Sequence, residues 1–157
     1  AAAQSRVSIP PTSTDRHSGA IRYAPFSDEA IDLFRQAAEN AGLPSQWAES
    51  AGLHNILKSE SNGWVGVPNY TYRTRSRKRH QWGSVHRELM SGHKTTRSSA
   101  TGLGQLLLAN VEAYYPDGRR GIGEPLNEAT GMLKYIKARY GTPEEAWRKY
   151  NTAHEGY

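Results

Sequence analysis

The sequence lacks cysteine altogether and is poor in apolar residues. With 0 Cys, it excludes disulfide-stapled scaffolds, thiolate zinc sites, iron–sulfur clusters and cysteine nucleophiles. Apolar residues make up 36% of the chain and mean hydropathy is −0.77. No stretch approaches the roughly 20 apolar residues of a membrane-spanning helix, so we expect no integral membrane segment. The 157 residues nevertheless include 4 Trp, 9 Tyr and 2 Phe, enough aromatic surface for one compact domain with its own core.

The N-terminal residues also lack the marks of a secretion signal. Ala1 to Gly19 has no apolar central region and no initiator Met, which suggests a processed form or an excised module. Pro10, Pro11 and several Ser and Thr residues predict that residues 1–25 form an extended arm or a linker. The remaining residues, 26–157, are expected to form one domain.

Positive charge is concentrated in one segment. The chain carries +5 overall, but residues 64–97 hold eight basic side chains and one acidic side chain, whereas the rest has 12 basic against 14 acidic. The basic residues of the segment are Arg73, Arg75, Arg77, Lys78, Arg79, Arg87, Lys94 and Arg97. We therefore read residues 64–97 as a basic insertion into an otherwise slightly acidic domain.

Helix signals recur along the domain, and strand-like alternation is limited to Val65–Tyr72. The expected helices run from an N-cap at Ser27 to Gly42, from about Pro44 to Ser59, over Leu103–Val111, from Asn127 to Gly141, and onward from a capping box at Thr142 and Glu145. The predicted fold class is mainly α.

Glu60 is the carboxylate that stands out. It follows Leu53, Ile56 and Leu57 at helical spacing, so it falls on the stripe that those residues bury. Loss of water disfavours the charged form of a carboxyl group and raises its pKa, as a general acid working near neutral pH requires. The competing interpretation is a frayed helix end whose carboxylate reaches solvent.

Two further patterns are weak when taken alone. Ala100–Gln105 reads Ala-Thr-Gly-Leu-Gly-Gln, a glycine turn where backbone can approach a ligand closely. It lacks the Gly-Lys-Ser/Thr of a phosphate-binding loop. Tyr150 and Asn151 fall at the end of the last expected helix, where they can hydrogen-bond sugar hydroxyl and acetamido groups, although an aromatic there is more often part of a core.

Together these patterns resemble the catalytic domain of soluble lytic transglycosylases, which is related in fold to goose-type lysozyme. The order is Glu60–Trp64, then Ala100–Gln105, then Tyr150–Ala153, where the family has a helix ending in Glu-Ser, a Gly-Leu-Met-Gln turn and a Tyr-Asn-Ala-Gly motif. Asn127–Gly141 resembles the helix that precedes the last motif. The resemblance covers roughly residues 44–157, interrupted by the insertion.

The resemblance implies cleavage of the β-1,4 bond between N-acetylmuramic acid and N-acetylglucosamine in peptidoglycan. Glu60 would be the single catalytic acid/base, protonating the glycosidic oxygen and then accepting the proton of the muramic C6 hydroxyl. That hydroxyl would close onto C1 and leave a 1,6-anhydro end. The reaction needs no second carboxylate, since the nucleophile belongs to the substrate, and no metal or organic cofactor.

The resemblance also implies the residues that line the cleft. Gln105 and the backbone at Gly102 and Leu103 would contact the saccharide, Tyr150 would orient Glu60 or touch the substrate, and Asn151 would brace that corner.

The sequence departs from the family at three places. Gly104 replaces the usual Met, Thr152–His154 replaces the Ala-Gly ending, and the family's Ser before the turn is matched by Thr96, Ser98 or Ser99.

The insertion has three possible roles. It could be a solvated loop, it could bind anionic wall polymers through Arg73–Arg79, or, as the least favoured role, it could bind single-stranded nucleic acid through interleaved aromatics. His80, His86 and His93 are too loosely spaced for a metal site and are assigned to the same loop.

Two rival functions remain. A goose-type muramidase would hydrolyse the same bond with water and would need a second carboxylate, for which Asp117, Glu124 and Glu128 are candidates. A non-catalytic module would bind the wall or nucleic acid through the insertion. The expected site of action is the bacterial cell wall or periplasm, for a bacterial remodelling enzyme or a virion-associated phage module.

Overall fold

The structure, a computed structural model, describes residues 19–69, 79, 82–91 and 98–153. Over these residues the chain is mainly helical, as predicted, and its β-structure is limited to isolated bridges. The helices are α1 (Asp28–Ala41), the 3-10 helix η3 (Ser45–Glu49), α2 (Ala51–Glu60), α4 (Trp82–Ser91), α5 (Leu108–Tyr114), the 3-10 helix η5 (Gly118–Gly121), α6 (Pro125–Tyr140) and α7 (Pro143–Ala153). None of them combines the length and the apolar character that crossing a bilayer demands.

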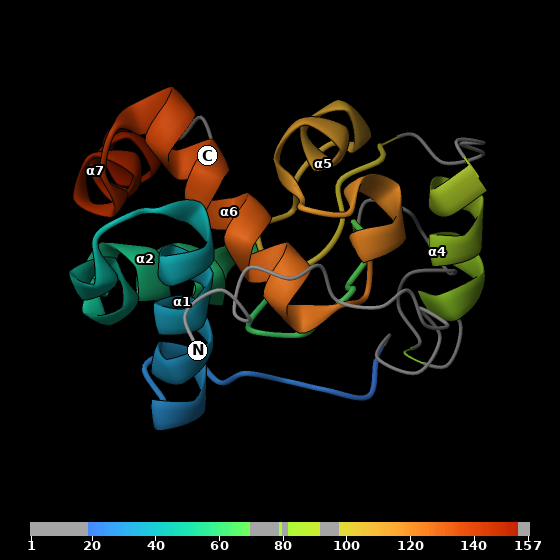
Figure 1. Cartoon of the computed structure of the whole chain (residues 1–157), viewed down its shortest axis with the longest axis horizontal. Helices are drawn as coiled ribbons and strands as arrows, with labels where there is room; N and C mark the ends of the chain where they lie inside the picture. Colours follow the sequence, from blue (N-terminus) through green and yellow to red (C-terminus); the bar gives the residue numbers. More distant parts are fainter. Residues whose placement is uncertain (1–18, 70–78, 80–81, 92–97, 154–157) are drawn as a thin grey trace.

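Helix α6 is the central element, and two hydrophobic clusters pack on its opposite sides. Met132, Leu133 and Ile136 join a larger core with α1, α2 and α7, whereas Tyr135 joins a smaller core with α4 and α5. Figure 1 shows α6 crossing the middle of the molecule, with α1, α2 and α7 toward one end and α4 at the other. Because α6 is covered on both sides, nine of its residues are buried, including the polar Asn127, Glu128 and Thr130.

Several helix ends lie where the sequence predicts them. The Ser27 hydroxyl accepts the N–H of Ala30 at the start of α1, and Gly42 ends that helix in the left-handed conformation with φ +68°. The Thr142 hydroxyl accepts the N–H of Glu145 at 3.1 Å, so the expected cap of α7 is confirmed. Helix α6 ends at Gly141 as expected and begins two residues earlier than Asn127.

Two helix predictions need correction. The helix expected over Leu103–Val111 begins only at Leu108, because Gly102 and Gln105 both have positive φ and fold the preceding residues into a turn. The helix expected over Pro44–Ser59 is divided into η3 and α2 by Ser50, whose extended backbone places its hydroxyl on the N–H of Leu53.

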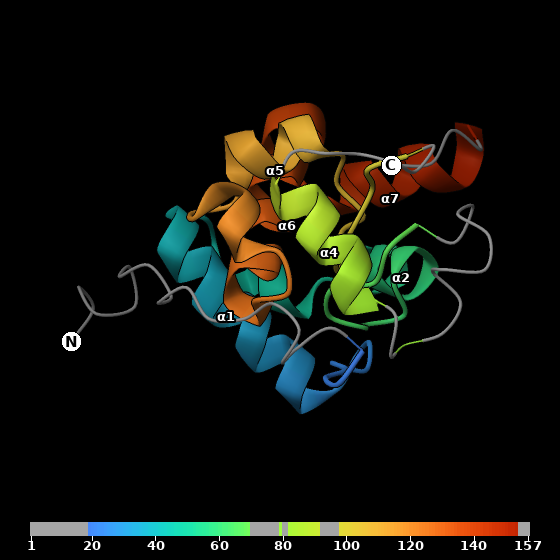
Figure 2. The same cartoon turned by 90° about the vertical axis from the view of Figure 1, so that its right-hand side faces the viewer.

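Helix α4 lies inside the segment that we interpreted as a basic loop. Trp82, Val85, His86 and Leu89 recur at helical spacing and are all buried. Figure 2 shows α4 facing the viewer below α5. The prediction that His86 belongs to a loop is therefore wrong, because a periodic apolar stripe was hidden among the charged residues. His80 and His93 lie outside the described residues.

The described part of the N-terminal arm pairs with the chain that follows α2. Arg22 forms an antiparallel bridge with Trp64, the N–H of Tyr23 donates to Gly63 O at 2.8 Å, and the N–H of Val65 donates to Ile21 O at 3.0 Å. Ile21 and Tyr23 also pack against the larger core. Residues 21–23 thus form an extended strap over Gly63–Val65.

Candidate active site

Glu60 is the last residue of α2, as the sequence predicts, and it is partly buried. Leu53, Ile56 and Leu57 on the same helix are fully buried. They hold the C-terminal turn of α2 against the larger core and place Glu60 at the core's edge. Among the described residues the Glu60 carboxyl has neither a hydrogen-bond donor nor an ion-pair partner.

Burial dominates the electrostatics of Glu60. Because the carboxyl group loses water and gains no cation in return, its pKa is raised to about 7 from 4.5. The rise that we expected from the apolar stripe is therefore present. A carboxyl group with this pKa is substantially protonated at neutral pH and can also accept a proton there, which is the property of a general acid/base.

The chain leaves α2 through a turn held by several hydrogen bonds. The N–H groups of Ser61 and Asn62 both reach Leu57 O, and the Ser61 hydroxyl accepts the N–H of Gly63 at 3.1 Å. Asn62 and Gly63 have φ of +52° and +83°, so the chain reverses sharply. The Arg22 guanidinium holds Asn62 from outside, with Nε donating to the backbone oxygen at 2.8 Å and a second nitrogen to Oδ1 at 3.2 Å.

The segment after this turn is hydrogen-bonded to the glycine turn. The N–H of Gly102 donates to Val67 O at 2.9 Å, and the N–H of Asn69 donates to Ala100 O at 3.0 Å. A second pair of hydrogen bonds, between Thr101 and Leu106, closes the turn. Two sequence motifs that are 40 residues apart, one at Glu60 and one at Ala100, are therefore joined through the hydrogen bonds of Val67 and Asn69.

Gln105 is fixed within the glycine turn by its own side chain. Its Nε2 donates to Val67 O at 2.7 Å and to Gly102 O at 3.0 Å, and its backbone has φ +52°. The Oε1 atom has no donor among the described residues, so it is the atom of this amide that can accept from a ligand. Gly102 and Leu103, the other predicted binding residues of this turn, are buried.

Glu128, which the sequence offers as a second carboxylate, is fully buried in α6. Its Oε1 accepts the N–H of Gly66 at 3.0 Å and the N–H of Leu103 at 2.9 Å, while Oε2 accepts the N–H of Gly123 at 2.7 Å. Burial, with a smaller contribution from nearby Glu124, raises its pKa to about 7 despite these three donors. A carboxylate enclosed in this way has no room for a substrate or for an attacking water.

The other two carboxylate candidates are also engaged elsewhere. Asp117 accepts from the Asn127 amide at 2.9 Å, at the start of η5. Glu124 is 3% exposed and precedes α6. It contributes to a cavity of about 430 Å³ with Glu29 and Asp32, and Glu60 is not among the residues that line this cavity.

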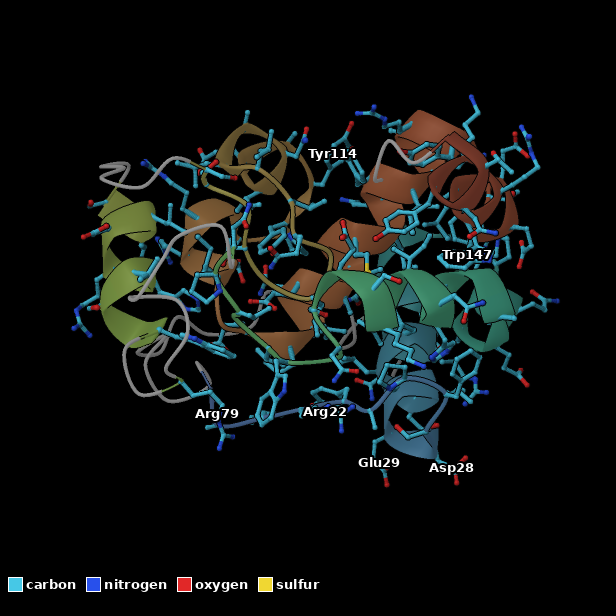
Figure 3. All side chains as sticks on the ribbon, turned by 180° about the vertical axis from the view of Figure 1, so that it is seen from behind. Arg22, Asp28, Glu29, Arg79, Tyr114 and Trp147 are labelled. Carbon is cyan, nitrogen blue, oxygen red and sulfur yellow. The ribbon has the colours of Figure 1, made fainter. Side chains whose placement is uncertain are left out.

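Tyr150 and Asn151 lie in the last turns of α7. This helix packs along α2, and its first turn touches the start of α2, because the Ser50 hydroxyl donates to the Glu144 carboxylate and a Cβ on Gly52 would meet Pro143 O at 2.8 Å. Tyr150 stacks on Trp147 with ring centroids 5.4 Å apart, and Figure 3 shows Trp147 where α7 meets α2. No hydrogen bond joins Tyr150 or Asn151 to Glu60 in the described part of the chain.

Arg79 and α4 contact the chain that follows Glu60, at Trp64 and Gly66. The Arg79 guanidinium lies 4.5 Å from the centroid of the Trp64 ring, and Trp64 meets Trp82 edge to face at 6.1 Å. Figure 3 shows Arg79 and Arg22 along one edge of the molecule. His86 on α4 hydrogen-bonds Gly66 O through Nε2. Residues 73–78, which carry most of the predicted wall-binding charge, lie outside the described residues.

The candidate serines before the glycine turn have structural partners. The Ser99 hydroxyl accepts the N–H of Leu108 at the start of α5, and the Ser98 hydroxyl accepts the N–H of Ala100. Thr96 lies outside the described residues. The described residues contain no group of three or more His, Asp or Glu side chains arranged to hold a metal ion.

Comparison with known protein families, curated proteins and solved structures finds no match to this chain.

Proposed function

We propose that this protein is a peptidoglycan lytic transglycosylase with Glu60 as its single acid/base. The observation that carries the proposal is a carboxyl group at a helix end with a pKa of about 7 and no charged partner among the described residues. Seven residues after Glu60, Val67 O accepts the N–H of Gly102 in the glycine turn. The order of motifs in the sequence, rather than any relative, supplies the substrate class and the lysozyme-like character of the fold.

The chemistry follows from one group that both donates and accepts a proton. Protonated Glu60 donates to the glycosidic oxygen as the bond from muramic C1 breaks, and the N-acetylglucosamine hydroxyl leaves. The resulting carboxylate accepts the proton of the muramic C6 hydroxyl as its oxygen bonds to C1. The products are a 1,6-anhydro end and a free 4-hydroxyl, and Glu60 returns to its protonated form with no water consumed.

The enclosed state of Glu128 favours this reaction over muramidase hydrolysis. Hydrolysis with water needs a second carboxylate across the cleft, and Glu128 has both oxygens committed to backbone donors. The transglycosylase needs only Glu60. On this proposal the substrate is the glycan strand of the bacterial wall, which is where the enzyme acts. In this proposal, Arg79 and the basic residues that precede it in the sequence bind anionic wall polymers.

The direct test is release of soluble fragments from dye-labelled sacculi. We expect fragments from wild type, from the control variant Glu39→Gln, whose carboxylate is exposed on α1, and none from Glu60→Gln. A Glu60→Gln protein as active as the control contradicts the proposal. If neither wild type nor the variants release dye, but wild type still sediments with sacculi, the protein is a wall-binding module instead.

A further inference from the structure

Glu128 is a buried titratable group that the proposed reaction does not use. It lies in α6, which packs between two hydrophobic clusters, and both of its oxygens accept backbone N–H groups. A fully buried carboxyl group costs several kcal/mol unless it is well hydrogen-bonded. An Ile or Leu there would fill the same space but would leave three buried N–H groups without an acceptor, so the carboxylate serves these donors rather than the packing of α6.

The three donors come from three different segments. Gly66 belongs to the extended segment after Glu60, Leu103 to the glycine turn, and Gly123 to the loop before α6. A single oxygen, Oε1, accepts the N–H groups of both Gly66 and Leu103. The segment that follows Glu60 and the glycine turn are therefore hydrogen-bonded to the same atom. The three donors thereby fix the relative positions of these segments.

Neighbouring groups reinforce this junction. His86 on α4 donates from Nε2 to Gly66 O, so the Gly66 residue is held from α4 on one side and from α6 on the other. At Gly102 a Cβ would lie 2.7 Å from the Tyr115 hydroxyl and 2.8 Å from Glu128 Oε1, so only glycine lets the turn sit this close to the carboxylate. The titratable groups around the Glu128 carboxyl are therefore Glu124, Tyr115 and, across Gly66, His86.

We propose that Glu128 is the positioning residue of the active site: it fastens the glycine turn to the segment that follows Glu60 and so sets the saccharide-binding turn against the acid/base. This inference rests on the proposed function for its catalytic consequence. Displacement by about 1 Å of groups that orient a substrate can lower turnover about 100-fold, so a loosened junction acts on kcat more than on KM.

The test uses Glu128→Gln with Asn127→Ala as its matched control. Glutamine keeps the size of the side chain, but its NH₂ group must face at least one of the three N–H donors. Asn127 is the neighbouring buried polar residue on α6, and it bonds Asp117 rather than the glycine turn. The two variants thus lose comparable buried hydrogen bonds at adjacent positions, and only one of them loses the junction.

Two readouts are compared between the variants. Amide hydrogen exchange at Gly66 and Leu103, followed by NMR, is expected to be at least 10-fold faster in Glu128→Gln than in Asn127→Ala. On soluble glycan strands, kcat is expected to fall at least 10-fold in Glu128→Gln with KM within 3-fold of wild type, while Asn127→Ala retains the wild-type kcat well below its melting temperature. Unchanged exchange, or faster exchange with full kcat, overturns the inference.

A measurement on wild type alone tests the inference even if the Glu128→Gln variant does not fold. The amide resonances of Gly66, Leu103 and Gly123 are expected to shift together with a single apparent pKa between pH 5 and 9, because one carboxyl group contacts all three. Different pH midpoints for the three amide resonances would contradict the inference that one carboxyl group holds all three segments. A wild type that is inactive on glycan strands overturns the proposed function, and with it the catalytic role of Glu128. An active wild type with a fully active Glu128→Gln overturns only this inference.

Discussion

The backbone N–H of Tyr23 donates to the backbone oxygen of Gly63 at 2.8 Å, three residues beyond Glu60. The two segments lie so close that a Cβ on Gly63 would be 2.0 Å from Tyr23 O. The strap of residues 21–23 therefore fixes the exit of α2 and, with it, the place of the proposed acid/base.

The first prediction is that Gly63→Ala is strongly destabilising. Its φ of +83° is strained for alanine, and the added methyl group would overlap the Tyr23 backbone. We expect a loss of about 2–4 kcal/mol in the free energy of unfolding, measured by urea titration. Gly42→Ala is the control, because Gly42 has φ +68° with nothing within 4 Å of its Cβ position, and we expect it to cost only about 1 kcal/mol. Equal losses of unfolding free energy in the two variants would show that residues 21–23 do not pack tightly against Gly63.

The second prediction concerns stability and pH at Glu60. Its pKa is about 7 in the folded protein and near 4.5 when unfolded, so between these values the folded state binds more protons. Stability from this group is full below pH 4.5 and is lost as pH rises through 7. Glu60→Gln removes this pH-dependent loss of stability. We expect its free energy of unfolding to exceed that of wild type by on the order of 1–2 kcal/mol at pH 8 and to equal it at pH 4.

The matched control for that comparison is Glu39→Gln, whose side chain is exposed. Thermal unfolding of the three proteins at pH 4, 6 and 8 separates the effects. A Glu60→Gln protein that is less stable than wild type at pH 8 means that the Glu60 carboxylate has a stabilising partner, contrary to the desolvation account.

The third prediction concerns the contact between α2 and α7. The Ser50 hydroxyl accepts the N–H of Leu53 at 3.1 Å and donates to the Glu144 carboxylate, whereas the Ser27 hydroxyl only caps α1. We expect Ser27→Ala to cost about 1 kcal/mol and Ser50→Ala about 2 kcal/mol. A double-mutant cycle with Glu144→Ala isolates the extra interaction between the two helices. If Ser50 and Glu144 contribute independently, the coupling energy is zero and the contact does not stabilise the fold.

The sequence predicted most of the helical architecture because helix ends carry local signals. Ser27, Gly42, Thr142 and Gly141 act within a few residues of themselves, and the structure uses each as a cap. Helix α4 was missed because charged residues outnumber apolar ones in its neighbourhood, although Trp82 and Leu89 follow the helical period. The charge of a segment does not exclude a buried stripe inside it.

The sequence indicated Glu60 but not the hydrogen bonds that hold the glycine turn. The apolar spacing before Glu60 is a local pattern, and it correctly indicates a raised pKa. The contacts of Glu128 with Gly66 and Leu103 span 62 and 25 residues, and a pairing over such separations leaves no periodic trace in one sequence. The available signal was a carboxylate beside Ala129 and close to Met132 and Leu133 on the helix with the most buried residues.

The most direct test of the central claim is mass spectrometry of purified peptidoglycan after digestion by wild type and by Glu60→Gln. The account predicts muropeptides with 1,6-anhydro ends from wild type, each 18 Da or so lighter than the corresponding hydrolysis product because no water is added, and none from Glu60→Gln. Reducing-end products from wild type would contradict the single acid/base mechanism and require a second carboxylate.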